Sequence, residues 1–476
     1  MTRILASEFL TVLDPDSFIR WDTPPKYGEI DQEYADALTR ANSKAEFDES
    51  IITGEGLING SPIAVIVFDF TFMGGSLGAV ASTRIMQAVH RATKQKLPLL
   101  VSPASGGARM QEDNRATVMM LTITSAVQRH RHANLPFIVY LRDPTMGGAM
   151  ATVGSLGHIT FAQPGASIGF LGPRVVGVIT GSKLPDGVQQ AENLAEHGIV
   201  DRVMPFEQLR NEMVKIVRIL APATPGGYIE TPKPTQKLNL LETIEVTRDP
   251  TRPGSFELME ELGDGVVKLS GAPGATVAIA RIHGRACVLI AQDRRHTLTT
   301  QALRLARHGA SLACELALPL VSIVDTPGAE LSQAAEEQGM VGSIARTIAT
   351  LVDAPLPSVT IILGQGVGAG ALAMLPGNLV YAAETAWLSA LPFEGASAIL
   401  YNDADHAAEI LERQGVLARS LVEMKLIDGL IAETDNFLQN VLATISNALS
   451  ELETNPERAG REARFARFEE LAQPNL

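Results

Sequence analysis

Strand-like segments that end in glycine turns recur at matching distances in the two halves of this 476-residue chain. In the first half, Gly107 in SGGAR and Gly148 in TMGGAMAT lie 41 positions apart. In the second half, Gly328 in DTPGAE and Gly370 in GVGAGALAM lie 42 positions apart. Each turn follows an apolar segment and precedes a stretch with helical periodicity. This spacing predicts an internal duplication of one folding unit.

The elements around these turns follow the same order in both halves. Gly169 comes 21 positions after Gly148, and Ala390 comes 20 positions after Gly370. Amphipathic helices are expected between the strands, and this alternation is typical of α/β architecture. The expected strands lie near residues 63–70, 97–102, 136–141, 286–291, 318–325 and 357–364.

A break in composition separates the two halves. The stretch APATPGGYIETPKPTQK contains four prolines and two glycines and shows almost no apolar periodicity. A chain of this length is too long for one hydrophobic core. We therefore predict a first domain over residues 1–225, a linker over 226–240 and a second domain over 241–476.

Charge and composition narrow the class of partners. Acidic residues outnumber basic ones, 53 to 39, and the net charge of -14 argues against a nucleic-acid ligand. The strongest apolar run, residues 63–75, is interrupted by Asp69 and is too short to span a bilayer, so no membrane partner is expected. Cys287 and Cys314 are the only cysteines, and both are expected to be buried thiols in a reducing, cytoplasmic setting.

The glycine turns have three possible roles. They can be ordinary strand-to-helix turns, or points where backbone segments pack closely. They can also collect several backbone N–H groups at the start of a helix, where such groups stabilise a developing oxyanion. Two similar halves would then provide two oxyanion sites.

Other catalytic motifs do not fit. Ser105 lies among glycines, but GxSxG is not satisfied, so we interpret it as a capping or turn residue. No phosphate-binding GxxxxGK[ST] motif occurs. His130 and His132 lie two positions apart on different faces of a helix and are expected at a solvated helix end, without a metal. Apart from the glycine turns, no acid–base constellation is present.

Several longer motifs resemble one enzyme family. ASGGARMQE, LPFIVYLRDPTMGGAMAT and GASIGFLGPRVV resemble the β subunit of bacterial acetyl-CoA carboxylase carboxyltransferase. DTPGAELSQAAEEQG, ILGQGVGAGALAM, FEGASAIL and EMKLIDGLI resemble its α subunit. The resemblance implies a β-like half fused to an α-like half, with two tandem crotonase-type (spiral ββα) domains. It also implies transfer of a carboxyl group from carboxybiotin to acetyl-CoA or a longer acyl-CoA.

The resemblance also assigns roles to residues. In the first half the acyl thioester oxygen would be held by Gly106, Gly107 and Ala108, with Gly147 and Gly148 nearby. In the second half Gly370 and Ala371 would hold the biotin carbonyl. Further biotin contacts are implied for Gly328, Ala329, Ala369 and Gly395. The candidates for CoA phosphates are Arg109, Arg174, Arg294 and Arg295, although Arg109 could instead pair locally with Glu112.

The family context implies partners and leaves alternatives. Biotin is expected on a separate carrier protein, with a biotin carboxylase subunit, and Lys425 in EMKLID is not expected to carry it. The chain has no cysteine before residue 287 and so lacks the family's zinc ribbon, and Ala369 replaces a glycine of the usual motif. At least a homodimer is expected. A malonate decarboxylase-type enzyme and a non-catalytic assembly paralogue remain the alternatives.

Overall fold

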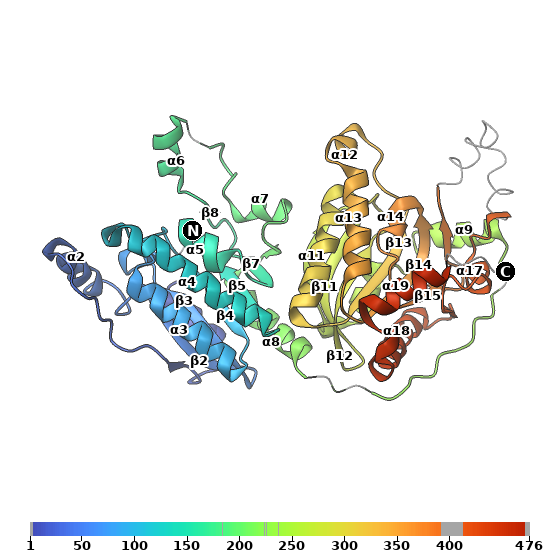
Figure 1. The fold of residues 1–476 in the computed structure, drawn as a ribbon, viewed down its shortest axis with the longest axis horizontal. Helices are drawn as coiled ribbons and strands as arrows, with labels where there is room; N and C mark the ends of the chain where they lie inside the picture. The colour runs from blue at the N-terminus through green and yellow to red at the C-terminus, as the bar shows by residue number, and fades with distance from the viewer. Residues whose placement is uncertain are drawn as a thin grey trace. The chain divides into compact units, whose positions relative to one another are not determined.

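The computed structural model describes residues 3–182, 184–222, 224, 226–236, 238–391 and 413–471 (Figure 1). The chain divides into two compact units, Met1–Val217 (unit 1) and Arg218–Leu476 (unit 2). Each unit is built around one mostly parallel β-sheet with helices packed against it, so the predicted α/β architecture is confirmed.

The sheet of unit 1 contains seven strands in the order β1-β2-β3-β4-β5-β7-β9. The first three strands are antiparallel, and every pairing from β3 onward is parallel. The strands of the sheet are β1 Ile19–Arg20, β2 Ile51–Ile58, β3 Ser61–Phe68, β4 Leu99–Ser102, β5 Phe137–Leu141, β7 Ile159–Ala162 and β9 Arg202–Val203. A separate parallel pair consists of β6 Thr145–Met146 and β8 Ile168–Gly169.

Helices of unit 1 cover the sheet because their apolar residues recur on one face. In α3 the buried residues Ala81, Ile85 and Val89 lie four positions apart and pack with Leu99 and Val101 of β4 in one core cluster. The helices are α1 Ala6–Phe9, α2 Gln32–Asn42, α3 Ala79–Gln95, α4 Asp113–His132, α5 Gly147–Ala149, α6 Pro173–Thr180, α7 Ala191–Glu196 and α8 Phe206–Leu220. A π-helical stretch, Met150–Gly154, continues α5.

The sheet of unit 2 repeats this topology with the order β10-β11-β12-β13-β14-β15-β17. Its first three strands are antiparallel and its later pairings are parallel, as in unit 1. The shared order and directions confirm the predicted duplication. The strands are β10 Val266–Ala272, β11 Ala275–Ile282, β12 Arg285–Gln292, β13 Leu320–Thr326, β14 Ser358–Val367, β15 Leu379–Ala383, β16 Trp387–Ser389, which pairs with β14, and β17 Gly429–Ile431.

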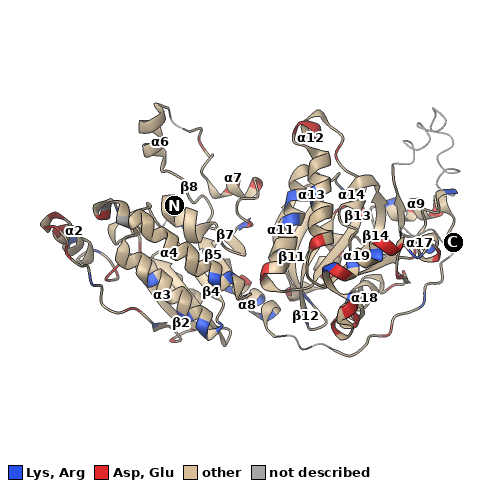
Figure 2. Ribbon diagram, viewed as in Figure 1, with Lys and Arg blue, Asp and Glu red and all other residues tan. Residues whose placement is uncertain are grey.

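Helices surround this second sheet, and Figure 2 shows basic residues on α11 and acidic residues on α12. The helices are α9 Leu240–Arg248, α10 Ser255–Glu261, α11 Thr300–Leu316, α12 Gln333–Glu337, α13 Met340–Asp353, α14 Gly368–Leu372, α17 Ala418–Glu423, α18 Phe437–Thr454 and α19 Gly460–Leu471. Lys425 lies just after α17 in a left-handed conformation with an exposed side chain.

The described residues between α8 and α9 form no helix or strand, yet they are attached to unit 2. The backbone N–H of Ile229 donates to Asn447 Oδ1 at 3.0 Å, and Asn447 Nδ2 donates back to the Ile229 carbonyl at 2.7 Å. Further along, the N–H groups of Thr235 and Gln236 both donate to Glu384 at 2.8 Å. These paired side-chain contacts hold the proline-rich segment along the surface of unit 2.

Candidate active site

The turn after β4 has a shape that requires glycine. Gly107 has a φ of 119°, in the range that residues with a Cβ rarely adopt. Its N–H donates to the Oγ of buried Ser105 at 3.0 Å, which confirms Ser105 as a turn residue. The N–H of Gly106 donates to the Gly74 carbonyl at 2.9 Å. Both amides are therefore occupied, and the prediction that Gly106 and Gly107 donate to a ligand is corrected.

The same turn leaves the N–H of Ala108 without a partner among the described residues. Leu77 forms hydrogen bonds with the residues before and after Ala108. The Leu77 N–H donates to the Gly107 carbonyl, and the Leu77 carbonyl accepts from the Arg109 N–H, each at 2.9 Å. Leu77 and Ala108 thus form an isolated parallel bridge. The half-buried Ala108 amide is held in a fixed direction and is available to an oxygen atom of a ligand.

A second turn, after β6, packs against the first. A Cβ built on Gly147 would lie 3.3 Å from the Gly107 Cα, so the two backbones are in contact. Gly147 begins α5, and Gly148 is its second residue, whose N–H has no partner within the helix. The turn that contains Ala108 therefore lies directly beside the amino end of α5 that contains Gly148.

The first turn of unit 2 has the same backbone conformation and hydrogen bonds as the turn after β4. Gly328 also has a φ of 119°, and its N–H donates to the Oγ1 of Thr326 at 3.1 Å. Leu298 bonds the Gly328 carbonyl at 2.9 Å and the Glu330 N–H at 3.0 Å, as Leu77 does in unit 1. Ala329 is left with a partner-free N–H among the described residues, which makes it the counterpart of Ala108.

The structure corrects the sequence register of the second turns. Met146 pairs with Gly169 in unit 1, and Val367 pairs with Ser389 in unit 2. The counterpart of Gly147 is therefore Gly368, with φ values of 59° and 63°. The spacing had instead matched Gly148 with Gly370. Positions 107 to 147 and 328 to 368 both span 40 residues. The counterpart of Gly148 is then Ala369, which is exposed at the amino end of α14.

Gly370 has a packing role, which is the second of the three roles considered above. A Cβ at this position would lie 2.9 Å from the backbone nitrogen of Ala329, so glycine lets α14 approach the turn. Its carbonyl accepts a hydrogen bond from Nε2 of buried Gln292 at 2.8 Å. Ala371 is the fourth residue of α14, and its N–H belongs to the helix's own hydrogen bonds. The strand register therefore places Ala329 and Ala369 at the positions that match Ala108 and Gly148, next to the predicted donor Gly370.

Arg109 is a buried structural residue, and its prediction as a CoA ligand is wrong. Its side chain is fully buried and forms an ion pair with the equally buried Glu49. Arg109 Nη1 lies 3.6 Å from Glu112, so the predicted local pair exists as a minor contact. Burial alone would raise the pKa of Glu49, but its hydrogen bonds with Arg109 hold the pKa below the ordinary value. Both groups are therefore charged at neutral pH.

The other predicted CoA ligands differ in exposure. Arg294 is almost buried and donates to Asp325 at 3.1 Å and to the carbonyl of Arg252. Its guanidinium is thus already engaged in the protein. Arg295 is exposed and pairs with Asp293 at 2.8 Å, and Arg174 is exposed in the first turn of α6. Gly395 lies outside the described residues.

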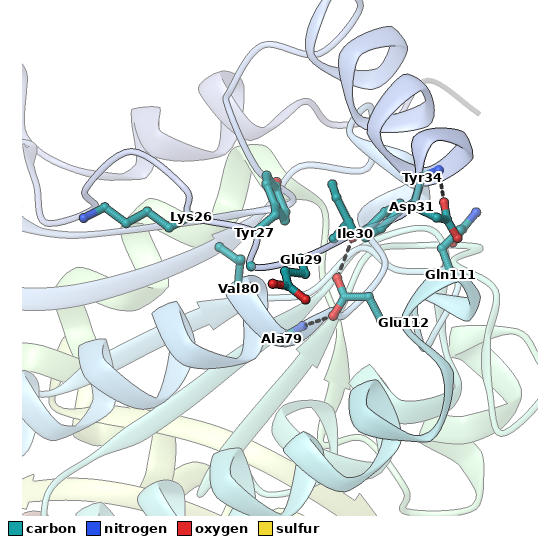
Figure 3. Close-up of a pocket in the computed structure, with 11 residues that line it drawn as sticks. Lys26, Tyr27, Glu29, Ile30, Asp31, Tyr34, Ala79, Val80, Gln111 and Glu112 are labelled. Atoms are coloured by element: carbon teal, nitrogen blue, oxygen red, sulfur yellow. Dashed lines mark hydrogen bonds between the residues drawn. The ribbon is translucent and has the colours of Figure 1, made fainter.

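A cavity of about 400 Å³ lies next to the Ala108 turn. It is open to solvent and is lined by the N-terminal segment that contains Lys26, Tyr27 and Tyr34, by the start of α3, and by Glu112. Figure 3 shows the Glu112 carboxylate between Tyr34 and the amino end of α3. Glu112 accepts from the Tyr34 hydroxyl and from the Ala79 N–H, both at 2.5 Å.

Several secondary predictions are also resolved. His130 is not at a solvated helix end, because it is buried with Nδ1 3.0 Å from Thr93 Oγ1, and burial lowers its pKa. Cys287 is buried as expected, with its pKa raised to about 12 by burial, whereas Cys314 is half-buried.

Among the described residues, no group of three or more His, Cys, Asp or Glu is arranged to hold a metal ion. Within the same residues, no helix is both long and apolar enough to span a membrane.

Sequence comparisons relate most of the chain to one protein family. The model of the carboxyl transferase domain family matches residues 23–466. A probable biotin-dependent acyl-coenzyme A carboxylase β3 subunit of Mycobacterium tuberculosis is 42% identical, over 98% of this chain and 99% of its own length. The acetyl-coenzyme A carboxylase carboxyl transferase subunits β/α of Saccharopolyspora erythraea are 31% identical, over 96% of this chain and 87% of theirs.

Solved structures share the fold. A crystal structure of transcarboxylase 12S with methylmalonyl-coenzyme A and methylmalonic acid bound superposes with a TM-score of 0.78 at 22% identity, covering 94% of this chain and 89% of that one. A single-chain, multi-domain long-chain acyl-CoA carboxylase superposes with a TM-score of 0.74 at 19% identity, covering 94% of this chain and 46% of that one. The predicted crotonase-type fold is thereby confirmed. The chain belongs to the carboxyltransferase family of the biotin-dependent acyl-CoA carboxylases.

Proposed function

We propose that this chain transfers a carboxyl group from carboxybiotin, carried by a separate protein, to the α-carbon of an acyl-CoA. The observation that carries the proposal is the duplicated turn. Among the described residues, the N–H of Ala108 in unit 1 and that of Ala329 in unit 2 have no partner, and each lies beside the amino end of a short helix. Donors of this kind suit oxygen atoms that gain negative charge during a reaction. The reaction needs two such oxyanion sites, one for the oxygen of the acyl thioester and one for the oxygen of the ureido group.

The chain's own residues would act through their backbone. The Ala108 N–H, with that of Gly148, would donate to the thioester oxygen as the enolate forms. The Ala329 N–H, with that of Ala369, would donate to the ureido oxygen. Biotin, when bound, supplies the carboxyl group and a ureido nitrogen that can accept the α-proton, which accounts for a site without a side-chain base. Removing one such donor typically costs about 2.7–4 kcal/mol of transition-state stabilisation.

The acyl substrate is proposed to be acetyl-CoA or a longer acyl-CoA. Acetyl-CoA is supported by the β/α relatives, whose names specify it, while the β3 relatives are named for acyl-CoA in general. The exposed cations Arg174 and Arg295 remain in the proposal as contacts for CoA phosphates. A biotin carrier and a biotin carboxylase subunit are the proposed partners, because the chain would need carboxybiotin made elsewhere.

A homodimer or larger homo-oligomer is proposed because apolar side chains are exposed around both turns. In unit 1, Phe170 is 76% exposed and Val178 of α6 is 81% exposed. In unit 2, Leu331 is 90% exposed and Leu372 of α14 is 50% exposed. We infer that these side chains belong to surfaces that another copy of the chain covers. Unit 1 of one copy facing unit 2 of another would cover them and bring the two kinds of site together.

The first test is malonyl-CoA-dependent carboxylation of biocytin by the purified chain. Acetyl-, propionyl- and butyryl-CoA are then compared as acceptors with the biotinylated carrier. Turnover that requires biotin would support the proposal. Malonyl thioester decarboxylation without biotin would indicate a malonate decarboxylase-type enzyme instead. A folded oligomer that binds the carboxylase partner without turnover would indicate the assembly paralogue.

A further inference from the structure

Arg109 connects three parts of unit 1 around the Ala108 amide. Its backbone N–H donates to the Leu77 carbonyl, and its guanidinium donates to the neighbouring Ser76 carbonyl, both at 2.9 Å. The Leu77 N–H completes the connection by donating to the Gly107 carbonyl. The segment of Ser76 and Leu77 is therefore fastened to the turn on both sides of Ala108. One of these three bonds comes from a charged side chain.

Glu49 fixes the guanidinium in this position. The carboxylate accepts from both terminal nitrogens of Arg109, with Nη1 at 3.0 Å. Ser50 also holds the guanidinium against the Ser76 carbonyl. Its Oγ accepts from Arg109 and donates to the Ser76 carbonyl at 2.9 Å. A bidentate pair of this kind fixes direction as well as distance.

Two tyrosines of the N-terminal segment separate this pair from the cavity of Figure 3. The Tyr27 hydroxyl donates to Glu49 Oε2 at 2.7 Å. The Tyr34 hydroxyl accepts from Arg109 Nη1 at 3.3 Å and donates to Glu112 at 2.5 Å. Arg109 and Glu49 are consequently fully buried although the cavity beside them is open to solvent.

Among the described residues, the equivalent turn of unit 2 has no ion pair at the positions that match Arg109 and Glu49. The strand register Ile51–Phe68 matches Ala275–Gln292, so Pro273 and Gly274 occupy the places of Glu49 and Ser50. The counterpart of Arg109 is Glu330, whose carboxylate accepts from Ser332 at 2.7 Å. Unit 2 places its nearest buried ion pair, Arg294 with Asp325, before the turn instead of beside Ala329. An ion pair at the place of Arg109 and Glu49 is therefore not needed to form a turn of this shape.

We infer that Arg109 and Glu49 are positioning residues, which hold the Ala108 amide rigidly for the acyl thioester in unit 1, while the matching turn of unit 2 has no ion pair at the equivalent positions. This inference rests on the proposed function for its kinetic part. Its structural part, the rigidity of the turn, is measurable without turnover.

The decisive variant is R109M/E49L, in which both charges are removed together. Apolar residues of similar volume often replace a buried ion pair with little loss of stability, whereas a single change leaves an uncompensated charge. We expect this variant to fold but to lose roughly 10- to 100-fold in kcat, because small misplacements of a donor are costly. The KM for biocytin should change less than about threefold, since the biotin side is untouched.

Hydrogen–deuterium exchange provides the second readout. Exchange of the amides at 105–110 should accelerate in R109M/E49L, while exchange at 326–331 in the same sample stays as in the wild type. The milder Tyr34→Phe variant should show a smaller change of the same kind. Arg84→Met is the matched control, because Arg84 is a buried arginine of unit 1 that bonds Asp48 and the Ile51 carbonyl and does not contact the turn. It should leave both kcat and exchange at 105–110 unchanged.

The outcomes separate the two proposals. If R109M/E49L folds like the wild type and keeps wild-type kcat or wild-type exchange at 105–110, the positioning role is wrong. If Arg84→Met lowers kcat equally, the effect reflects general stability and the inference also fails. If the wild type itself shows no biotin-dependent turnover, the proposed function fails, and the exchange data still decide whether Arg109 and Glu49 hold the turn.

Discussion

At the scale of single residues, the site depends on backbone conformation rather than on reactive side chains. Gly107 and Gly328 share a φ of 119°, and the neighbouring hydroxyls of Ser105 and Thr326 accept their N–H groups. Each turn thereby uses one amide internally and leaves the next one free. The glycine motifs were visible in the sequence, but the choice of free amide was not, because it depends on which N–H finds an internal acceptor.

Gly107→Ala should reduce carboxyl transfer at least tenfold, because a Cβ at this φ costs roughly 1–3 kcal/mol and shifts the Ala108 amide. Gly60→Ala is the control, since Gly60 also has a positive φ of 75° but lies in the β2–β3 hairpin with open space around it. Both variants are compared by kcat and by urea unfolding. Equal loss of kcat in the two variants would contradict the role of the Gly107 turn.

Gly370→Ala should impair the biotin side selectively. The new Cβ would lie 2.9 Å from the Ala329 nitrogen, so the turn or α14 must move. We expect the kcat for biocytin carboxylation to fall several-fold or more, with little change in KM for malonyl-CoA. Gly263→Ala, at a positive-φ glycine of unit 2 with open space, is the control. An unchanged kcat for Gly370→Ala would show that α14 tolerates the Cβ.

At the scale of elements, the hydrophobic pattern was sufficient to predict strands and helices but not how polar residues join them. Strand β4 was expected from LPLLVS, and it is buried throughout. The proline-rich segment before α9 was expected as a linker, and no pattern indicated that Asn447 and Glu384 would bind it. Likewise His130 was expected in solvent, but it is buried and lies within hydrogen-bond distance of Thr93 in a different helix. Contacts between distant segments decide such cases.

Asp14 shows how one carboxylate joins elements and makes stability depend on pH. It accepts from the N–H groups of Gly60 at 2.8 Å and Asn59 at 2.9 Å, and from Arg210 of α8 at 2.7 Å. The Gly60 N–H and then Arg210 lower its pKa, so its stabilising contribution is present above the unfolded pKa and is lost as pH falls through the folded value.

Asp14→Asn should therefore lower the free energy of unfolding at pH 7, and the difference from the wild type should shrink as the pH falls below the ordinary carboxyl pKa of about 3.9. Urea unfolding of both proteins at a series of pH values checks this. Asp16→Asn is the control, because Asp16 lies in the same loop and takes no part in these hydrogen bonds. A difference that persists unchanged at pH 3 would mean that the carboxylate charge is not the cause.

At the scale of the whole molecule, duplication provides two similar turns that differ in their support. Unit 1 anchors its turn with Arg109 and Glu49, and unit 2 packs Gly370 against its turn. A transferase with two chemically different substrates would benefit from this difference, because one fold then provides two separately adjusted oxyanion sites. The proposed pairing of unit 1 of one copy with unit 2 of another makes a quantitative prediction.

Mixed dimers of a Gly107→Val chain and a Gly370→Val chain should regain about half of the wild-type activity, provided each variant alone is inactive. In a dimer with paired units, one site then carries both changes and the other carries neither. Co-expression with two different affinity tags isolates the mixed species, and sedimentation confirms its size. Inactive mixed dimers would show that each chain completes its own sites, because every site would then contain one change.

The sequence by itself determined the fold class, the duplication and the approximate place of both sites, because hydrophobic periodicity and glycine spacing are local properties. Only the tertiary structure decided the individual roles. Strand pairing moved the counterpart of Gly148 from Gly370 to Ala369, and burial showed that Arg109 is an internal anchor instead of the expected ligand. The physical reason is that a free amide or a buried charge is defined by its partners in space, and those partners come from segments far apart in the chain.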